Sequence, residues 1–557
     1  MGKGTFRTLP VLLLAVLTAV VLSPAVGHSF WYGNEISTEH IDELTAENLH
    51  QYIVENILDP PRPPGTPSPF ADSLRGVDNN PDGITGLRIY KPEKTWDGYT
   101  LLSSLGGHLC DPPRGICNAI LIDMNGEMVK EWLLGAVPAK MLPGGDVIGS
   151  VPERNDTGFR GSKTLQQQDW CGNEVWRYDN FGEPGGADWH HDHEREGNPV
   201  GYYAPGLRPY TDWGKTLILS HGYPGVIGTI STFPLLDDRI YEIDWDGTIL
   251  FDWYAKDHFD QMGFHAEARD AIMNIQVGRP PTTTTDWQHF NSASYLGPNK
   301  WYGCGQGDLR FHPDNIIFDS RTANYMGIIA RYDHPEGKWQ AGDIIWKVGP
   351  HFSASYPEHK IGQIIGLHMA HMIPRGLPGA GNILVFDNGG IAGFDSFLPG
   401  MPGYYPATYR NYSRVIEFDP ITLDIVWEYM DPVQEGDVNG DGEVKGDERK
   451  FYSNLISGAQ RLKNGNTLIT EGHGGRVFEV TYEGEIVWEY ISPYEDGRAP
   501  RATDPNSVYR AYRVPYWWVP KYNNCDGEDP PWHWGYRHWG HWDWNRYNGG
   551  YNSNTCY

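Results

Sequence analysis

The sequence predicts an all-β fold, a six-bladed β-propeller with four-stranded blades, and three observations support this. The chain of 557 residues is rich in residues typical of strands and turns, with 67 glycines, 42 prolines and 13% aromatics. Long helical periods are scarce, which also favours β structure. The third observation is a motif that occurs six times, and repetition of one motif along a chain is the mark of a repeat architecture.

Each copy of the motif reads as an apolar strand, a polar turn, and a second apolar strand that carries a tryptophan. The turns suit tight hairpins, and the alternation of apolar and polar residues suits strands with one buried face. The six copies end at or surround Trp132, Trp176, Trp253, Trp346, Trp427 and Trp488.

A second hairpin follows several of these copies, as in KMLPGGDVIGS after Trp132 and RLKNGNTLITEG after Trp427. We assign each Trp hairpin and the hairpin that follows it to one four-stranded blade. Six such blades closed into a ring leave only short, protected sheet edges. The propeller is expected over residues 86–520.

The two ends of the chain read differently from the repeats. Residues 1–27 have a basic start, an apolar run over residues 9–22 and a small-residue cleavage site, as in a secretory signal peptide. The run is shorter than the roughly 20 residues of a membrane-spanning helix, and no later run is longer. We therefore expect a secreted or periplasmic protein without a membrane span. Residues 28–85 read as an extension and linker, and residues 521–557 as a tail rich in Trp, His and Tyr.

The charge of the chain limits its partners. The formal net charge is −27, and removal of the signal segment lowers it to −29. Nucleic acid is excluded as an expected partner, because its binding needs clustered positive charge. An anionic ligand would need a local positive pocket within an overall negative field.

Six cysteines in an exported chain are expected to form disulfides. A disulfide between Cys110 and Cys117 would close a small ring, and a disulfide between Cys525 and Cys556 would constrain the tail. Cys171 and Cys304 remain by elimination. Six cysteines allow fifteen pairings, and the sequence does not choose between them.

Residues 437–448, DVNGDGEVKGDE, match the spacing of a calcium-binding loop of EF-hand type, with Gly442 at the sharp turn. Lys445 stands where a water often serves as a ligand. The flanking residues do not read as long helices, so we predict a structural Ca²⁺ site in a loop of the propeller. The alternative is an acidic surface loop. The expected ligands are Asp437, Asn439, Asp441, the carbonyl of Glu443, and Glu448.

Three histidines lie where the innermost strands of different blades are expected to begin. His368 lies five residues before the apolar residue that starts the next hairpin turn, and His191 and His289 occupy similar segments of other blades. Innermost strands face the central channel, so these histidines should converge; the alternative is a set of structural hydrogen-bonding histidines. The run HHDHE at residues 190–194 also suggests a metal cluster, but neighbouring strand residues point to opposite faces.

Nine motifs carry a resemblance to a known family. In chain order they are GLRIYKPEKTWDGYTLL, ILIDMNGEMVKEW, HHD, DWQHFNS, FDSR, FDNG, YSRVIEFD, SGAQRLKNGNTLITEG and VYRAYRVP. With them the chain resembles, over about residues 86–515, the bacterial arylsulfate sulfotransferases, which are six-bladed propellers. The resemblance implies an enzyme without an organic cofactor or a nucleotide sulfate donor. It would move a sulfuryl group from a phenolic sulfate ester to a phenol through a sulfated histidine, in a ping-pong mechanism.

The resemblance also implies roles for residues of this chain. His368 would be the nucleophile, because a neutral imidazole is nucleophilic near pH 7 and covalent capture splits one displacement into two easier ones. Either His191 or His289 would be the general acid and base. The candidate catalytic residues are His368, His289, His191, Arg321 and Asn291, and the candidate substrate-binding residues are Ser457 and His190.

The chain departs from the family pattern at Leu367, where a glutamine usually precedes the nucleophile, and in the insertion RGLPGA. Pairing with Asp319 is the alternative interpretation of Arg321. The alternative function is a secreted propeller that only binds, for example at a cell surface, since fold does not fix function. The Trp-rich tail would suit stacking on sugars or docking to a partner. The expected partners are a small phenolic sulfate and a phenol, and the sequence does not indicate an oligomeric state.

Overall fold

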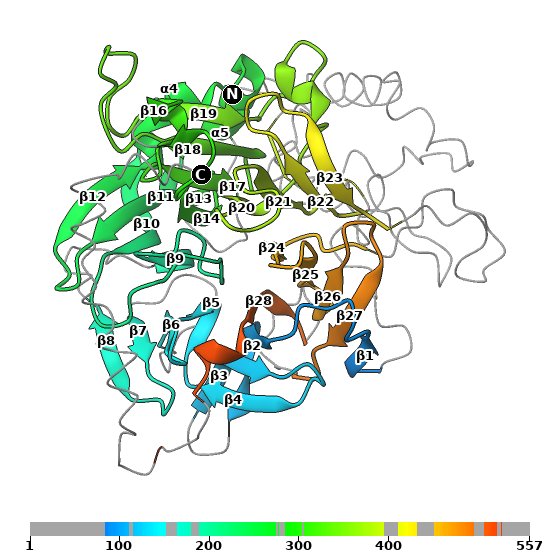
Figure 1. Ribbon diagram of the computed structural model, residues 1–557. Helices are drawn as coiled ribbons and strands as arrows, with labels where there is room; N and C mark the ends of the chain where they lie inside the picture. The colour runs from blue at the N-terminus through cyan, green and yellow to red at the C-terminus, as the bar shows by residue number, and fades with distance from the viewer. Residues whose placement is uncertain are drawn as a thin grey trace, which may run out of the picture. The chain divides into compact units, whose positions relative to one another are not determined.

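Six antiparallel sheets follow one another along the chain and form the six blades of a β-propeller (Figure 1). The predicted all-β fold with six four-stranded blades is therefore confirmed. The structure is a computed structural model that describes residues 84–110, 115–151, 164–179, 189–274, 277, 284–303, 306–390, 392–394, 410, 412–431, 451–494, 506–520 and 525. The predicted signal segment, the calcium loop and all of the predicted tail except Cys525 lie outside the described residues.

The first blade joins the two ends of the described chain. Its three outer strands are β2 (Tyr99–Cys110), β3 (Gly115–Ile122) and β4 (Met128–Trp132). Its innermost strand, β28 (Val508–Val514), comes from the other end of the chain and pairs antiparallel with β2. This closure fixes the ring, because the last strand cannot leave without opening the first blade.

The four core strands of each of the other five blades run in chain order from the innermost position outward. The second and third contain β5 (Gly135–Met141), β6 (Val147–Ser150), β7 (Leu165–Gln168) and β8 (Glu174–Tyr178), then β9 (Trp189–Arg195), β10 (Thr216–Val226), β11 (Pro234–Ile243) and β12 (Ile249–Tyr254). The fourth contains β14 (Phe290–Tyr295), β17 (Ile316–Ser320), β18 (Tyr325–Ile329) and β19 (Ile344–Val348). The fifth and sixth contain β20 (His368–Met372), β21 (Ile383–Asp387), β22 (Arg414–Phe418) and β23 (Ile425–Tyr429), then β24 (Gly458–Arg461), β25 (Thr467–Glu471), β26 (Arg476–Val480) and β27 (Ile486–Ile491).

Short strands and helices are added to the six blades. The strand β1 (Gly86–Tyr90) adds a fifth strand to the sixth blade, and β13 (Thr285–Asp286) pairs in parallel with β11. A small hairpin is formed by β15 (Tyr302–Gly303) and β16 (Gln306–Gly307). The helices are η3 (Ala255–His258), α4 (Phe259–Met262), α5 (Ala266–Asn274), η4 (Leu309–Phe311), η5 (Pro357–Lys360) and η6 (Tyr516–Trp518). In the described part of the chain, none of them has the length and apolar character needed to cross a membrane.

The hairpin that follows each Trp strand opens the next blade. The segment KMLPGGDVIGS, for example, contains β5 and β6, and β6 pairs onward with β7. The prediction that each Trp hairpin and the following hairpin share a blade is therefore wrong. The periodicity shows the order of the hairpins, whereas hydrogen bonding between strands decides which hairpins form one sheet.

The six repeated tryptophans hold adjacent blades together. Each lies in the fourth strand of its blade, and its indole N–H donates to a carbonyl in the connection before the fourth strand of the next blade. The donor–acceptor pairs are Trp132–Asp169 (3.1 Å), Trp176–Trp245 (2.9 Å), Trp253–Gly342 (2.8 Å), Trp346–Pro420 (2.9 Å), Trp427–Tyr482 (2.8 Å) and Trp488–Met124 (2.9 Å). The last bond leads from the sixth blade back to the first, so the ring of bonds is closed.

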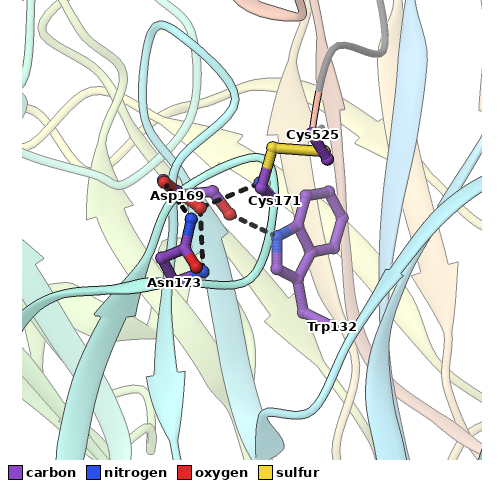
Figure 2. Close-up of a disulfide and its surroundings, with 5 residues drawn as sticks. All are labelled: Trp132, Asp169, Cys171, Asn173 and Cys525. Atoms are coloured by element: carbon purple, nitrogen blue, oxygen red, sulfur yellow. Dashed lines mark hydrogen bonds between the residues drawn. A yellow bond between two sulfur atoms is a disulfide. The ribbon is translucent and has the colours of Figure 1, made fainter. Parts of the chain in front are cut away.

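A disulfide joins Cys171 to Cys525, with Cα atoms 5.4 Å apart (Figure 2). The predicted pairings of Cys525 with Cys556 and of Cys171 with Cys304 are therefore wrong. Cys171 lies in the turn between β7 and β8, where its N–H donates to the carboxylate of Asp169 (2.8 Å). The partners are 354 residues apart in sequence, so only the closed ring brings them together.

Candidate active site

The innermost strands β9, β14 and β20 lie near one another (Figure 1), and the three predicted histidines at their starts come together. His191 lies near the start of β9, His289 directly before β14, and His368 at the start of β20. The ring centroids of His191 and His289 are 4.7 Å apart. The charge of His289 acts on both His191 and His368. We call these three histidines and Arg321 the histidine cluster.

The backbone at these strand starts is bent in a way that aims the side chains. The φ angles of His191, His289 and Met369 are 56°, 52° and 54°, in the left-handed region that residues with side chains seldom adopt. Each of the three strands also shifts register against its neighbour at this point. Bulges of this kind re-aim side chains, and such strained backbone gathers at functional sites.

His368 is held in one orientation by three hydrogen bonds. Its Nδ1 donates to the carbonyl of Gly366 (3.0 Å) and to Oδ1 of Asn388 (2.7 Å). Its Nε2 accepts the backbone N–H of Ile456 (3.0 Å). These partners place the proton on Nδ1 and the lone pair on Nε2. Burial, and next the charge of Arg321, hold the pKa of His368 well below its ordinary 6.5, so the ring is neutral at pH 7.

Arg321 follows β17 and is partly buried beside His368. Within the described part of the chain no carboxylate pairs with its guanidinium. Asp319 is not its partner, because that carboxylate accepts the N–H groups of Asn291, Ser292 and Ala370 and the Ser292 hydroxyl. A positive charge without a counter-ion next to a neutral imidazole is suited to an anionic ligand.

His289 has a carboxylate partner of its own. Its Nδ1 lies 2.6 Å from Oδ2 of Asp286, and about a quarter of each side chain is exposed. Burial opposes ionisation of Asp286, but the charge of His289 and the hydrogen bond between them lower the pKa of Asp286 to about 2. An ionised Asp286 fixes the His289 ring and leaves its Nε2 to face other groups.

Within the residues that the structure describes, His191 has no carboxylate partner. Its Nδ1 lies 2.7 Å from Nδ1 of His190, and burial, the charge of His289 and that of His190 hold the pKa of His191 well below 6.5. His190, which is not a member of the histidine cluster, also stacks on His221, with ring centroids 3.6 Å apart. The structure therefore gives His191 and His289 different electrostatic surroundings.

Two further predicted residues hydrogen-bond to protein groups, although Oδ1 of Asn291 has no hydrogen-bond partner in the described part of the chain. Asn291 donates through Nδ2 to the carbonyl of Leu367 (3.2 Å), the residue before His368. The hydroxyl of Ser457 donates to Ser453 Oγ (2.8 Å) and accepts the N–H of Gly472 (3.0 Å). Both residues are fully buried, and both support the strands around His368.

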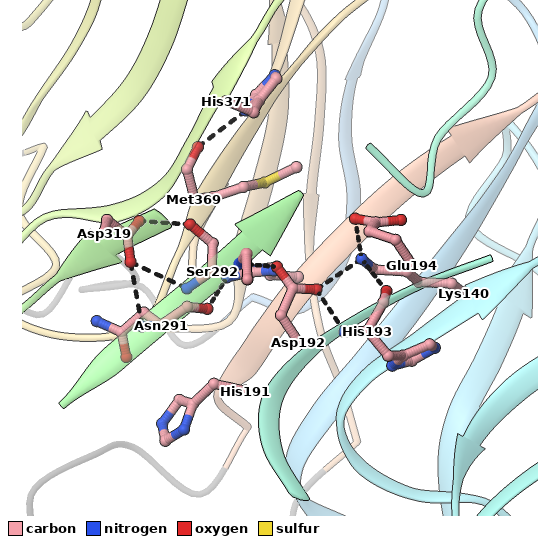
Figure 3. A network of polar contacts seen from close by, with 12 residues as sticks. Lys140, His191, Asp192, His193, Glu194, Asn291, Ser292, Asp319, Met369 and His371 are labelled. Atoms are coloured by element: carbon pink, nitrogen blue, oxygen red, sulfur yellow. Dashed lines mark hydrogen bonds and ion pairs between the residues drawn. The ribbon is translucent and has the colours of Figure 1, made fainter. Parts of the chain in front are cut away.

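A network of buried charges lies beside the histidine cluster (Figure 3). Lys140 donates to Asp192 and Glu194, each at 2.6 Å, and Arg510 pairs with Asp192 at 3.1 Å. Burial opposes the charge of Lys140, but Asp192 and Glu194 outweigh it and raise the pKa of Lys140. We call Lys140, Asp192, Glu194, Asp319 and Arg510 the channel network.

Several residues of the site were missed by the sequence analysis. They are Asn388, Asp286, Tyr509, Arg510, His221 and Asp238. The first four lie inside the motifs FDNG, DWQHFNS and VYRAYRVP, so their positions were marked although their roles were not. No sequence pattern marked His221 or Asp238 as site residues, because their possible role depends on side chains that lie next to them on adjacent strands.

A surface cavity of about 520 Å³ lies away from this site. It is lined mainly by residues of the fifth and sixth blades, including Glu417 on β22 and Arg461 on β24, and none of its lining residues is a histidine.

Comparison with known proteins identifies the family. Residues 214–487 match the family model of the arylsulfotransferases (ASST). Residues 214–487 therefore belong to the arylsulfotransferase family. The predicted resemblance is therefore confirmed, and family membership points to aryl sulfotransferase activity and to aryl sulfates as substrates. The matched region contains His289, Arg321 and His368, and begins after His190 and His191.

Solved structures are similar to this arylsulfotransferase only at a distance. They include a protein of unknown function from Bacteroides caccae, with 13% identity, 75% of this chain and 99% of that chain covered, and a TM-score of 0.37. The Dos1 propeller has 8% identity, coverage of 76% and 79%, and a TM-score of 0.28. Virginiamycin B lyase from Staphylococcus aureus has 11% identity, coverage of 65% and 70%, and a TM-score of 0.26. No curated protein matches the chain.

Proposed function

We propose that this arylsulfotransferase is an exported enzyme that transfers a sulfuryl group from a phenolic sulfate ester to a phenol, through a sulfated His368 and without a nucleotide donor. The observation that carries the proposal is a neutral, buried imidazole beside Arg321, a cation that has no carboxylate partner in the described structure. In a chain of net charge −27, an anionic donor needs such a local positive site. Arg321 would hold the sulfate oxygens, and His368 would attack the sulfur.

The hydrogen bonds of His368 support Nε2 as the attacking atom. The carbonyl of Gly366 and the amide oxygen of Asn388 keep the proton on Nδ1. In the resting structure the lone pair of Nε2 accepts the N–H of Ile456, so attack requires that this bond breaks. Ile456 and Ser457 have φ angles of 56° and 90°, and a donor that shifts this strained segment would free the lone pair.

The reaction then proceeds in two displacements. In the first, Nε2 of His368 forms a bond to sulfur while the bond from sulfur to the aryl oxygen breaks. The departing phenolate takes a proton from a general acid, and the sulfated histidine remains. In the second, the acceptor phenol gives its proton to the same group, its oxygen bonds to sulfur, and the N–S bond breaks. Arg321 would stabilise the sulfuryl oxygens in both transition states.

We assign the acid and base role to His289 rather than His191. Asp286 stays ionised at the Nδ1 side of His289, so His289 can carry a proton on that side while its other nitrogen exchanges one with the phenol. The low pKa of His191 keeps that ring neutral, which suits a hydrogen-bonding role. The ring contact between them would place both beside the leaving oxygen.

The test is a transfer assay with a chromogenic aryl sulfate and a phenol acceptor, without any nucleotide. We expect release of the donor phenol and sulfation of the acceptor. After brief reaction with donor alone, peptide mass spectrometry should find a sulfated histidine in the peptide of residues 361–374. His368→Ala should remove the adduct and lower transfer by about 10⁵- to 10⁶-fold, as loss of a covalent nucleophile does in other enzymes.

His371→Gln is the matched control, because His371 lies on the same strand and is equally buried, at 2% exposure. This variant should keep the adduct and the transfer. An adduct at His191 or His289 would contradict the assignment of the nucleophile. No release of the donor phenol by a folded protein would favour the alternative of a propeller that only binds.

A further inference from the structure

Three polar side chains meet on one face of the third blade, outside the histidine cluster. They are His190 on β9, His221 on β10 and Asp238 on β11. His221 and Asp238 are direct partners in the register of β10 and β11, so their side chains share a face of the sheet. One ligand-type atom from each of the three residues lies within 4.8 Å of the other two.

These atoms are buried and lack hydrogen-bond partners. The exposed fractions of His190, His221 and Asp238 are 2%, 5% and 0%. Within the described part of the chain, His190 Nε2, His221 Nδ1 and Asp238 Oδ2 have no partner with hydrogen-bond geometry, although His190 Nε2 lies 3.3 Å from the other oxygen of Asp238, Oδ1. Buried polar groups are normally satisfied, and three unsatisfied groups aimed at one spot therefore point to a missing partner.

We propose that this trio binds a Zn²⁺ ion through His190 Nε2, His221 Nδ1 and the carboxylate of Asp238. Two imidazoles and one carboxylate are a known ligand set for zinc, with a fourth position left for water. Ligands at about 2.0–2.1 Å from a tetrahedral ion lie about 3.4 Å apart, and one ligand atom of each residue already lies within 4.8 Å of the other two, so a small movement of the side chains would close the site. The ligands come from three adjacent strands, so the objection to a metal cluster within one run of residues does not apply.

The second oxygen of Asp238 and the neighbouring residue are already engaged elsewhere. Asp238 Oδ1 accepts the N–H of Phe290 (3.1 Å), which fixes the carboxylate. Asp237 faces the opposite side of β11, where it accepts the indole N–H of Trp287 (3.1 Å). The carboxylate aimed at the two imidazoles is therefore that of Asp238.

The metal would act on the histidine cluster through His190. A metal on Nε2 of His190 leaves the proton on Nδ1, which then donates to His191 Nδ1 at 2.7 Å. His191 would in turn carry its proton on Nε2 and present it toward the cluster. Metal-binding histidines commonly donate their other N–H in this way, so His190 is a positioning residue for His191.

The test measures metal and needs no substrate, so its outcome is independent of the sulfotransferase proposal. The full-length protein is dialysed with Zn²⁺, freed of excess metal and analysed for bound zinc. We expect one equivalent more in the wild type than in His221→Gln/Asp238→Asn. Replacement by Co²⁺ should give the visible d–d absorption of a tetrahedral site in the wild type and not in that variant.

The matched control is His533→Gln/His541→Gln, which removes two histidines from the C-terminal segment and should leave this equivalent unchanged. Thermal melting establishes that each variant is folded. Zinc content and Co²⁺ spectra that are the same in the wild type and in His221→Gln/Asp238→Asn would overturn the proposal. It would also be overturned if the wild type bound no zinc, since water would then be the missing partner.

Discussion

Two arginines in the centre of the propeller have opposite surroundings. Arg510, in the channel network, is 1% exposed, pairs with Asp192 and donates to the carbonyl of Asn291. Arg321, in the histidine cluster, is partly exposed and has no described carboxylate partner. Both are cations near the same inner strands. The difference indicates that the charge of Arg510 is engaged by the network, whereas the cluster keeps the charge of Arg321 for a ligand.

The histidines follow the same division. His371 lies beside the network, and its ring nitrogens contact the Tyr202 hydroxyl (2.8 Å) and the Met369 carbonyl (2.9 Å). His368, three residues earlier, points its lone pair at a single backbone N–H. A group whose hydrogen bonds all go to fixed protein atoms supports the fold, and a group with a displaceable bond is available for chemistry.

The largest effect is expected from breaking the network. Arg510→Met leaves Asp192 with less compensation in a buried site, which should cost about 3–5 kcal/mol of the free energy of unfolding. Thermal and denaturant unfolding measure this loss. An unchanged free energy of unfolding would show that Arg510, like Arg321, does not contribute to the stability of the fold.

The next effect should fall on activity and not on stability. Arg321→Gln should lower kcat/KM for sulfuryl transfer by about 10²- to 10³-fold, as loss of one oxyanion donor does, with little change in melting temperature. Removal of this charge also raises the pKa of His368, so the acidic limb of the pH profile should move to higher pH. A strong loss of stability with unchanged turnover would reverse the roles assigned to the two arginines.

Acid should destabilise the protein through its buried neutral histidines. Burial lowers the pKa of His371 from 6.5 to about 4, so below pH 6.5 the unfolded chain binds a proton that the folded protein does not. Above pH 6.5 the ring of His371 is neutral in both states, so it does not lower the free energy of unfolding. As the pH falls below 6.5, protonation of the unfolded chain lowers the free energy of unfolding, by about 3 kcal/mol at pH 4. His371→Gln should show a smaller loss of stability between pH 7 and pH 4 than the wild type. The exposed His359→Gln is the control, and equal pH dependence in all three proteins would contradict the argument.

The smallest effect should come from a segment that belongs to neither region. We propose that residues 437–448 bind Ca²⁺, as their sequence predicts, and that this stabilises the fold without changing catalysis. For a Kd of about 1 mM, 10 mM Ca²⁺ would add about 1.4 kcal/mol. The melting temperature should therefore be higher in Ca²⁺ than in chelator, and Asp437→Ala/Asp441→Ala should remove the difference while kcat stays the same. Equal melting temperatures for the wild type in both conditions would exclude the site.

The sequence by itself determined the repeating parts of this protein. Local alternation, tight turns and the repeated tryptophan specified the hairpins and hence the propeller, because these patterns depend on residues close together in the chain. The family motifs also marked His289, Arg321 and His368, since each lies at a fixed place relative to a strand.

Only the tertiary structure decided which distant groups meet. Three features join residues whose spacing in the sequence follows no repeating pattern. They are the pairing of Cys171 with Cys525, the closure of the first blade by β28 and the placement of His221 and Asp238 beside His190. The sequence also did not indicate that Arg510 has a carboxylate partner and Arg321 has none, because the pairing of a charge depends on its neighbours in space. Local sequence fixes strands and turns, while ring closure brings their side chains into contact and so determines the electrostatics of the site.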